Sequence, residues 1–478
     1  MNRFSDLERF ADRIALIASD GQQYSYKWLL EYGDAVAQQA AERSLVFLIG
    51  SNTPQCIAGY VGFIRRGVVP VLINHTVSQE MINQLIDAYQ PEYIYRPNAE
   101  LNDYELSQLA SSPNGESVTT LPLVASLPPF NPLANSGSQL YPELGLILTT
   151  SGSTGSPKFV RLTYENLFSN AQSIAEYLEI AADDRAITTL PMTYSYGLSI
   201  INPHLISGAC IILTDAPIIG KDFWSLFKEQ NPTTFGGVPF VYDMLKKLRF
   251  ARMNCPSLKY ITQAGGHLSE ELVKEYEDIC KQKGIKFIVM YGQTEATARM
   301  AYMPWDKLEG RENSIGIAIP GGEFFLIDDA GAVIDQPDVP GELCYRGPNV
   351  SLGYATCREE LAKGDDNGGV LHTGDVAKRD AEGFYYIVGR KKRFLKIFGN
   401  RVNLDEVQTL LLKRGIEAAC VGKDDAMKVY VVTGADCNAV RQLLAELTHL
   451  NQSAFTVLNI DAIPRNDAGK ILYSKLEN

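Results

Sequence analysis

TTSGSTGSPK, at residues 149–158, follows an apolar run at 146–149 and precedes a segment with a helical pattern at 164–179. Small residues let a backbone fold tightly, so that amide N–H groups and hydroxyls can surround a phosphate. The loop is not a Walker A motif, because it lacks GxxxxGK[ST]. A flexible linker is disfavoured by the strand before the loop, the helix after it and the lysine at its end. The candidate phosphate-binding residues are Thr150, Ser151, Gly152, Ser153, Thr154, Gly155 and Lys158.

Short β-type runs alternate with amphipathic helical segments on both sides of this loop. Before it, the sequence predicts strands at 14–19, 46–50 and 68–73, and helices at 26–42 and 55–66. After it, we expect strands at 186–190, 209–214, 234–238, 260–263 and 286–290, with helices between them. Strand–helix–strand order with Gly and Pro between the elements predicts an α/β fold with parallel sheets.

The pattern changes at residue 322, from which β-type runs and turns predominate, with strands expected at 323–327, 341–346 and 384–388. A polar stretch at 113–138 predicts a surface loop. Asn403 and Glu406 form a capping-box pattern ahead of a helix that Gly415 ends. We place a domain boundary at the basic segment 390–392, which gives an N-terminal domain at 1–389 and a C-terminal domain at 390–478.

Composition narrows the class of protein. The 478 residues carry a formal net charge of −12, which argues against a nucleic-acid partner. Eight cysteines and five histidines are scattered, without the spacing of a disulfide framework or a metal site. The N-terminus has charges throughout and no signal-peptide core, and no apolar run is long enough to span a membrane. These features predict a cytoplasmic protein.

The loop at 149–158 resembles the signature of the adenylate-forming superfamily, which includes acyl-CoA synthetases, peptide-synthetase adenylation domains and luciferases. Further motifs follow in the family's order: QAGG at 263–266, YGQTE at 291–295, HTGD at 372–375, GRKK at 389–392 and PRNDAGK at 464–470. The resemblance covers essentially the whole chain. It implies a large domain of α/β subdomains with a small β-barrel-like region, followed by a mobile α+β C-terminal domain that rotates at a hinge at Lys392.

The resemblance also assigns roles to residues. It implies that the loop Gly265–Gly266 closes over adenine, that Tyr291 stacks beside it within Tyr291-Gly292-Gln293, and that Thr294 reaches phosphate. Glu295 would help to hold Mg²⁺. Asp375 would accept the ribose hydroxyls and Arg390 would contact ribose or phosphate. Lys396 and Gly399 would lie in the loop that enters for thioester formation, and Lys470 would contact the carboxylate and the α-phosphate.

The segment LPMTYSYGL at 190–198 resembles the substrate-entry segment of the family. Ser195 stands where amino-acid-activating domains have an aspartate, which disfavours an α-amino acid. The expected pocket residues are Tyr194, Ser195, Tyr196, Gly237, Val238, Gly265 and Ala296, with Arg299 near the rim. This lining favours an uncharged aliphatic, aryl or hydroxy acid, and an inward-pointing Arg299 would allow a second carboxylate.

The implied reaction uses ATP and Mg²⁺ to convert a carboxylic acid to an acyl-AMP, with Lys470, Thr154, Lys158 and Glu295 stabilising the developing charge. A thiol then accepts the acyl group, either free CoA or the phosphopantetheine of a separate carrier protein, and the basic residues Lys391, Lys392, Arg393, Lys396 and Arg401 could receive it. Two alternatives stay open: an adenylating enzyme with a non-thiol acceptor, and a non-catalytic nucleotide-binding module.

Overall fold

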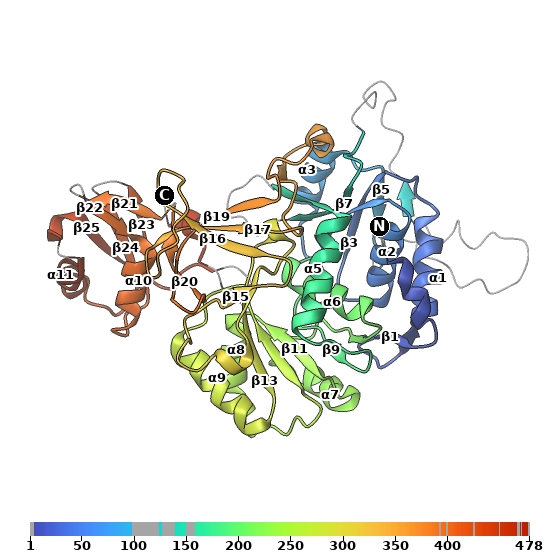
Figure 1. Ribbon diagram of the computed structural model, residues 1–478, viewed down its shortest axis with the longest axis horizontal. Coiled ribbons are helices and arrows are strands. Elements are labelled where there is room, and N and C mark those ends of the chain that lie inside the picture. Colours follow the sequence, from blue (N-terminus) through green and yellow to red (C-terminus); the bar gives the residue numbers. More distant parts are fainter. Residues whose placement is uncertain are drawn as a thin grey trace, which may run out of the picture.

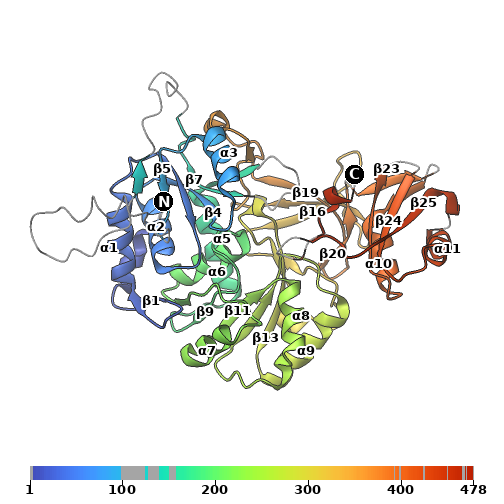
Figure 2. The same ribbon diagram turned by 180° about the vertical axis from the view of Figure 1, so that it is seen from behind.

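The computed structural model describes residues 4–97, 124–126, 139–149, 158–391, 393–397, 400–423, 426–448, 450–465, 469 and 471–476. Two large sheets with their helices form the main body, and a smaller C-terminal body lies to one side of it (Figures 1 and 2). A four-stranded sheet lies between the two bodies in both views.

The larger sheet has nine strands and is parallel through its centre. Its strand order is β15 (Ile317–Ala318), β14 (Ala301–Tyr302), β13 (Lys286–Tyr291), β12 (Tyr260–Gln263), β11 (Thr234–Gly237), β9 (Arg185–Ile187), β10 (Cys210–Ile212), β1 (Ile14–Ile17) and β2 (Gln23–Ser25). The strands at both edges, β2, β14 and β15, pair antiparallel. Buried parallel strands joined by helices are the arrangement that the alternating pattern predicts.

The second sheet has seven strands, of which β7, β4, β3 and β5 are parallel neighbours. Its order is β18 (Tyr354–Ala355), β8 (Phe159–Thr163), β7 (Leu144–Thr149), β4 (Val69–Asn74), β3 (Leu45–Gly50), β5 (Tyr93–Tyr95) and β6 (Val124–Ser126). The strands β3, β4 and β7 are almost completely buried, as expected for strands covered on both faces.

The helices of the main body are α1 (Tyr26–Ala37), α2 (Pro54–Arg65), α3 (Gln79–Tyr89), α5 (Tyr164–Tyr177), α6 (Ser195–Ile206), α7 (Lys221–Gln230), α8 (Pro239–Lys247) and α9 (Glu270–Lys283). Five of them begin at a side chain that accepts a hydrogen bond from the third helical residue, namely Ser25, Thr53, Ser78, Thr163 and Ser269. Helices α5 and α6 lie between the two sheets and contribute residues to both hydrophobic cores.

The four-stranded sheet is antiparallel and has the order β16 (Glu323–Ile327), β17 (Gly341–Arg346), β19 (Val370–Arg379) and β20 (Tyr385–Arg390). The C-terminal body has its own core, built from β21 (Phe394–Ile397), β22 (Asn400–Asn403), α10 (Leu404–Leu412), β23 (Ala418–Lys423), β24 (Ala426–Val432), α11 (Cys437–Thr448) and β25 (Phe455–Ile460). The predicted fold class is therefore confirmed, whereas the boundary at 390 and the hinge stay predictions.

Three local predictions need correction. The residues after Lys158 form strand β8, which pairs antiparallel with β7, so the loop at 150–157 joins two strands and does not lead directly into a helix. Residues 124–126, inside the predicted surface loop, form strand β6. Helix α1 ends at Ala37, five residues before the predicted end at 42, where turns precede β3. No helix among the described residues combines the length and apolarity needed to cross a bilayer.

Helices α1 and α2 touch through their backbones at Gly33 and Gly62. A β-carbon added at Gly62 would overlap the Gly33 carbonyl group, so we expect Gly62→Ala to lower the free energy of unfolding by about 2 kcal/mol, although alanine is the better helix former. Denaturant unfolding measures the change. Gly364→Ala is the matched control, because its β-carbon would approach no heavy atom closer than 3.9 Å. Equal midpoints for the two variants would contradict the close packing.

Candidate active site

The predicted site residues gather at the carboxyl ends of β11, β12 and β13, where the nine-stranded sheet meets the four-stranded sheet. Ligands of open α/β sheets bind at this end of the strands. Tyr291 ends β13, Gly237 ends β11, and Gly265 follows β12. Asp375 and Arg390 lie opposite each other on β19 and β20.

Asp375 forms the centre of a hydrogen-bonded cluster. Its Oδ2 accepts hydrogen bonds from the Tyr291 hydroxyl at 2.5 Å and from Gln293 Nε2 at 3.2 Å. Its Oδ1 lies 3.2 Å from Arg390 Nε. Gln293 Nε2 also donates to the Thr373 carbonyl oxygen at 3.1 Å. Three residues from two strands and one turn thus fix the direction of a carboxylate that is only 4% exposed.

The charges in this cluster follow from its burial. Removal from water raises the pKa of Asp375 above its usual range, while the Arg390 charge and the hydrogen bonds from Tyr291 and Gln293 oppose that rise. Burial, and then the nearby Asp375 charge, raise the pKa of Tyr291 well above 10. Tyr291 is therefore a neutral donor at physiological pH, and Asp375 is an acceptor with two oriented oxygens, which suits a cis-diol.

Glu295 and Lys158 lie on either side of Tyr354. The Tyr354 hydroxyl donates to Glu295 Oε1 at 2.5 Å, and Lys158 Nζ lies 6.0 Å from the centre of the Tyr354 ring. Burial and the Glu295 charge raise the pKa of Tyr354, so its proton stays on the hydroxyl. Strand pairing produces this arrangement, because Tyr354 on β18 pairs with Val160 on β8, directly after Lys158.

The site residues predicted from the sequence did not include Tyr354. The signal was present in the sequence as an aromatic residue directly after glycine, downstream of the Arg346-Gly347-Pro348 turn. Its significance depends on a strand pairing between residues almost 200 positions apart.

The glycines at the strand ends permit close approach. Gly265 has a φ of +81°, which favours glycine, and a β-carbon there would lie 2.8 Å from the Tyr194 hydroxyl. The loop is held by Gln263, whose Nε2 donates to the Gly266 carbonyl oxygen at 2.9 Å. At Gly292 a β-carbon would overlap the carbonyl oxygen of Ala298. At both positions a side chain would therefore collide with neighbouring parts of the chain, so the packing requires glycine.

The predicted acid-pocket residues come together at the N-terminal end of α6. Ser195 Oγ and Thr294 Oγ1 are 3.0 Å apart, which joins α6 to the turn that carries Glu295. Tyr194 is half-buried, whereas Ser195, Tyr196, Gly237, Val238 and Ala296 are buried. Nucleotide-side and acid-side residues therefore meet at Thr294.

Arg299 does not lie at the pocket rim, and that prediction is wrong. Its side chain is 2% exposed, its guanidinium carbon lies 5.4 Å from the centre of the Tyr196 ring, and Nε donates to Ser199 Oγ at 2.9 Å. Nη1 donates to the Tyr177 hydroxyl at 3.0 Å and Nη2 to the Ser199 carbonyl oxygen at 3.1 Å. A buried guanidinium needs such acceptors, so Arg299 packs behind the pocket.

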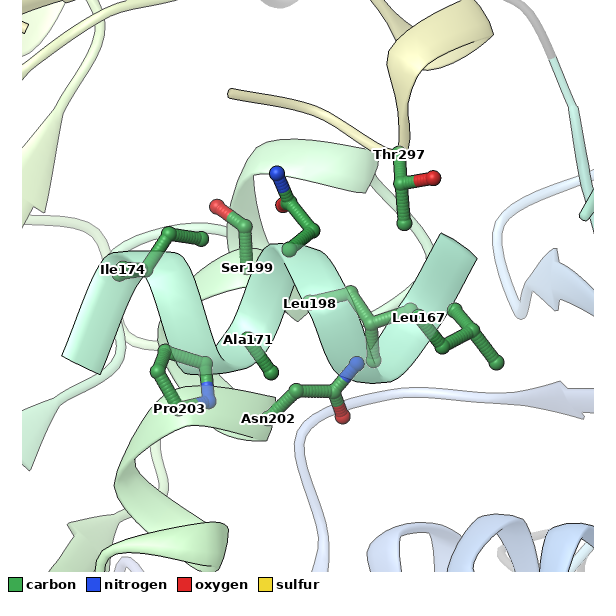
Figure 3. Close-up of a pocket in the computed structure, with 9 residues that line it drawn as sticks. Leu167, Ala171, Ile174, Leu198, Ser199, Asn202, Pro203 and Thr297 are labelled. Carbon is green, nitrogen blue, oxygen red and sulfur yellow. The ribbon is translucent and has the colours of Figure 1, made fainter. Parts of the chain in front are cut away.

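Two other hollows are unsuitable as substrate sites. A cavity of about 10 Å³ lies between α5 and α6, lined by side chains such as Ala171, Ser199 and Asn202 (Figure 3), and it has room for about one water molecule. A larger hollow of about 230 Å³ has Glu143, Glu165 and Asp365 in its lining, which would repel a triphosphate.

Two side chains of the expected acceptor surface are described, those of Arg393 and Lys391. Arg393 points into the C-terminal body, where Nε bonds to Asp405 at 2.6 Å and the guanidinium lies 3.6 Å from the centre of the Tyr473 ring. It is therefore not a surface residue for an acceptor, contrary to the prediction. Lys391 Nζ is paired with Glu342 at 2.7 Å.

The remaining predicted residues lie outside the part of the chain that is described. These are Thr150, Ser151, Gly152, Ser153, Thr154, Gly155, Lys392, Gly399 and Lys470, together with the side chains of Lys396 and Arg401.

Residues 4–355 match the family model described as AMP-binding enzyme. The chain belongs to this family. The medium-chain fatty-acid–CoA ligase of Escherichia coli strain K12 is 30% identical over 346 residues, which are 69% of this chain and 60% of that protein. The indoleacetate–CoA ligase of Aromatoleum aromaticum is 26% identical over 458 residues, 91% of this chain and 88% of that protein.

Solved structures show the same fold. The O-succinylbenzoate Coenzyme A synthetase of Bacillus subtilis in complex with AMP has a TM-score of 0.78 and 22% identity, covering 100% of this chain and 98% of that one. The same synthetase in complex with ATP and magnesium ion has a TM-score of 0.76 and 21% identity, covering 98% of each chain. The predicted superfamily and the predicted class of enzyme, an AMP-forming acid–thiol ligase, are confirmed.

Proposed function

We propose that this protein activates a carboxylic acid with ATP as an acyl-adenylate, releases pyrophosphate and transfers the acyl group to the thiol of CoA. The observation that carries the proposal is the buried, oriented carboxylate of Asp375 beside Tyr291, within reach of the turn that links Thr294 to the acid side. CoA is the acceptor of the relatives named above. A carrier-protein pantetheine is the alternative acceptor.

The reaction needs no protein nucleophile. A carboxylate oxygen of the acid attacks the α-phosphorus in line, and the bond to pyrophosphate breaks. The sulfur of the acceptor then attacks the acyl carbonyl, its proton goes to solvent, and AMP leaves. Positioning and charge stabilisation by the chain therefore supply the catalysis.

The described residues have defined tasks in this scheme. Asp375 binds the ribose, with Gln293 and Arg390 holding its direction. Tyr354 donates to Oε1 of Glu295, and the Glu295 carboxylate would hold Mg²⁺, which usually binds through one or two carboxylates and the phosphates of the substrate. When bound, the ion neutralises triphosphate charge and makes pyrophosphate a better leaving group. Lys158, which lies near the Tyr354 ring, adds positive charge close to Glu295.

Other parts of the proposal extend the resemblance. Lys470 stabilises the adenylation transition state, rotation at Lys392 exchanges it for the loop of Lys396 and Gly399, and the loop at 150–155 holds phosphates. We also propose a cytoplasmic location, since eight scattered cysteines without a CxxC pair are usual in a reducing compartment.

The test measures pyrophosphate release with MgATP across fatty, aryl, hydroxy and amino acids, each with and without CoA. Acid-dependent release that CoA accelerates is the expected result. Acid-dependent release that only a pantetheinylated carrier protein accelerates would replace CoA by the carrier. ATP binding without release by any acid would favour a nucleotide-binding module.

The pH dependence of nucleotide use should change in Arg390→Gln. Asp375 can accept hydrogen bonds from both ribose hydroxyls only when it is ionised, and the Arg390 charge lowers its pKa. Removing that charge raises the pKa further, so the acid limb of kcat/KM for ATP is expected to move to higher pH. A pH profile of both enzymes at saturating acid checks this. A lower plateau with an unmoved limb would mean that Arg390 acts on the nucleotide and not on Asp375.

A further inference from the structure

Strand β11 packs closely against helix α6 beside the predicted acid-pocket residues. A β-carbon at Gly236 would lie 2.8 Å from the Tyr196 hydroxyl and 2.9 Å from Ile200 Cδ1. Contacts below 3.0 Å leave no room for even one methyl group between strand and helix. The backbone at the end of β11 is therefore packed directly against the Tyr196 side chain.

Tyr196 is held in place on both sides. Its hydroxyl donates to the Thr262 carbonyl oxygen at 3.0 Å, and the residue is 3% exposed. On the other side its ring covers the Arg299 guanidinium, 5.4 Å from the ring centre. Moving the ring would break a buried hydrogen bond and uncover a buried cation, so Tyr196 acts as a fixed wall and not as a gate.

Exposure falls sharply from the mouth of the pocket to this wall. Tyr194, Gly265 and Thr294 are partly exposed, whereas Ser195, Tyr196 and Val238 are buried. Buried side chains thus begin directly next to the partly exposed residues.

The position of Arg299 behind Tyr196 also argues against a substrate with a second carboxylate. Nε, Nη1 and Nη2 of Arg299 each donate to the protein, and within the described residues Arg299 forms no ion pair. It lies behind Tyr196, so Arg299 would not be available to pair with a distal carboxylate of the substrate, which would lose hydration without gaining this partner.

We propose that the acid substrate is a short aliphatic monocarboxylic acid, with or without a hydroxyl, whose uncharged tail ends at Tyr196. This inference rests on the proposed ligase function. It separates this chain from its relative that is named for medium-chain fatty acids.

The experiment measures kcat/KM for acid-dependent pyrophosphate release with acetate, propionate, butyrate, lactate, hexanoate, octanoate, benzoate, malonate and succinate. One methylene in an apolar pocket changes kcat/KM about ten-fold or more. The wild type is therefore expected to use its best two- to four-carbon monocarboxylic acid at least about 100-fold better than octanoate. Malonate and succinate are expected to be poorer than the monoacid of equal length.

Tyr196→Ala and Tyr196→Leu shorten the wall and are expected to raise the octanoate-to-butyrate ratio at least about ten-fold. Tyr242→Phe is the matched control, since the Tyr242 hydroxyl donates to the same Thr262 carbonyl oxygen, at 2.7 Å, from α8. It removes an equivalent hydrogen bond without shortening the wall, so the order of acids should persist.

The possible results distinguish a failure of this inference from a failure of the proposed ligase function. An active wild-type enzyme that prefers octanoate, benzoate or a diacid overturns the inference and leaves the ligase function standing. Active Tyr196 variants with an unchanged ratio overturn the role of Tyr196 as the wall. No release with any acid on the panel, or with longer and amino acids, overturns the ligase function and the inference with it.

Discussion

Replacing Lys470 by alanine is expected to slow acyl-adenylate formation about 100- to 1000-fold, the usual effect of removing one preorganised group that stabilises developing charge. Negative charge builds on the α-phosphate as the acid attacks, and a lysine ammonium at that point stabilises the transition state more than the ground state. Transfer of the acyl group from a preformed acyl-adenylate to CoA should be nearly unchanged, because the proposed rotation has removed Lys470 by then.

The described neighbours of position 470 are held by hydrogen bonds. Arg465 Nη1 donates to the Gly469 carbonyl oxygen at 2.9 Å, and Leu472 N donates to Pro464 O at 2.8 Å. Gly469 has a φ of +77° and faces Phe240, whose Cβ would lie 4.0 Å from an added β-carbon. Phe240 belongs to α8, which starts directly after Val238 of the acid pocket. Gly469, the residue before position 470, therefore lies beside the start of α8 and close to the predicted acid site.

Two assays separate the steps. Exchange of labelled pyrophosphate into ATP reports adenylation, and thioester formation from a synthetic acyl-adenylate reports transfer. Lys475→Ala, an exposed lysine five residues further on, is the control and should behave as the wild type in both. Equal losses of Lys470→Ala in the two assays would remove the distinction between an adenylating and a transferring arrangement.

The parts of the fold that the sequence predicted well are those that local patterns determine. Strands β12, β16 and β17 lie within the predicted bounds because each is a continuous β-type run between turns. Strand β8 was missed because only five residues separate Lys158 from the helix, and its partner β7 lies on the far side of the loop. Short strands are defined by their pairing as much as by their own residues.

The site residues divide in the same way, into those that local motifs predict and those whose roles depend on residues far away in the sequence. Motifs predicted which residues would gather near Asp375, Glu295 and Tyr194, since each motif carries its chemistry locally. Tyr354 was missed and Arg299 was misplaced because their roles depend on neighbours far away in the sequence. An arginine two residues from a strand can point to a rim or into a core, and only the acceptors at Ser199 and Tyr177 decide the direction.

Asp375→Asn is expected to lower kcat/KM for ATP about 100-fold, because the amide keeps one acceptor oxygen but loses the other, and with it one ribose hydrogen bond to a charged acceptor, worth about 1.5–3 kcal/mol. The asparagine amide would also turn a donor toward Tyr291, Gln293 or Arg390, all of which are donors in this cluster. Loss of the ion pair with Arg390 should change the free energy of unfolding only a little, because the Arg390 side chain is 60% exposed and water can replace the lost partner.

Asp338→Asn is the matched control for this exchange. Asp338, which lies in a turn, also forms an ion pair, at 3.0 Å from Lys378 on β19, but 64% of its side chain is exposed. Its φ of +60° is one that asparagine adopts readily, so the control carries no backbone strain. We expect wild-type kinetics for it, and an equal loss in both variants would indicate a general effect of removing a carboxylate.

Calorimetric titration with AMP and ATP shows on which part of the nucleotide Asp375 acts. The ribose is common to both ligands, so Asp375→Asn should weaken the binding of AMP and of ATP by the same factor. The two oxygens of Asp375 are fixed by Tyr291, Gln293 and Arg390 before any ligand binds, and the loss should therefore appear as affinity and not as a slower chemical step. A variant that binds AMP normally but ATP weakly would place the carboxylate at the phosphates, and the ribose assignment would be wrong.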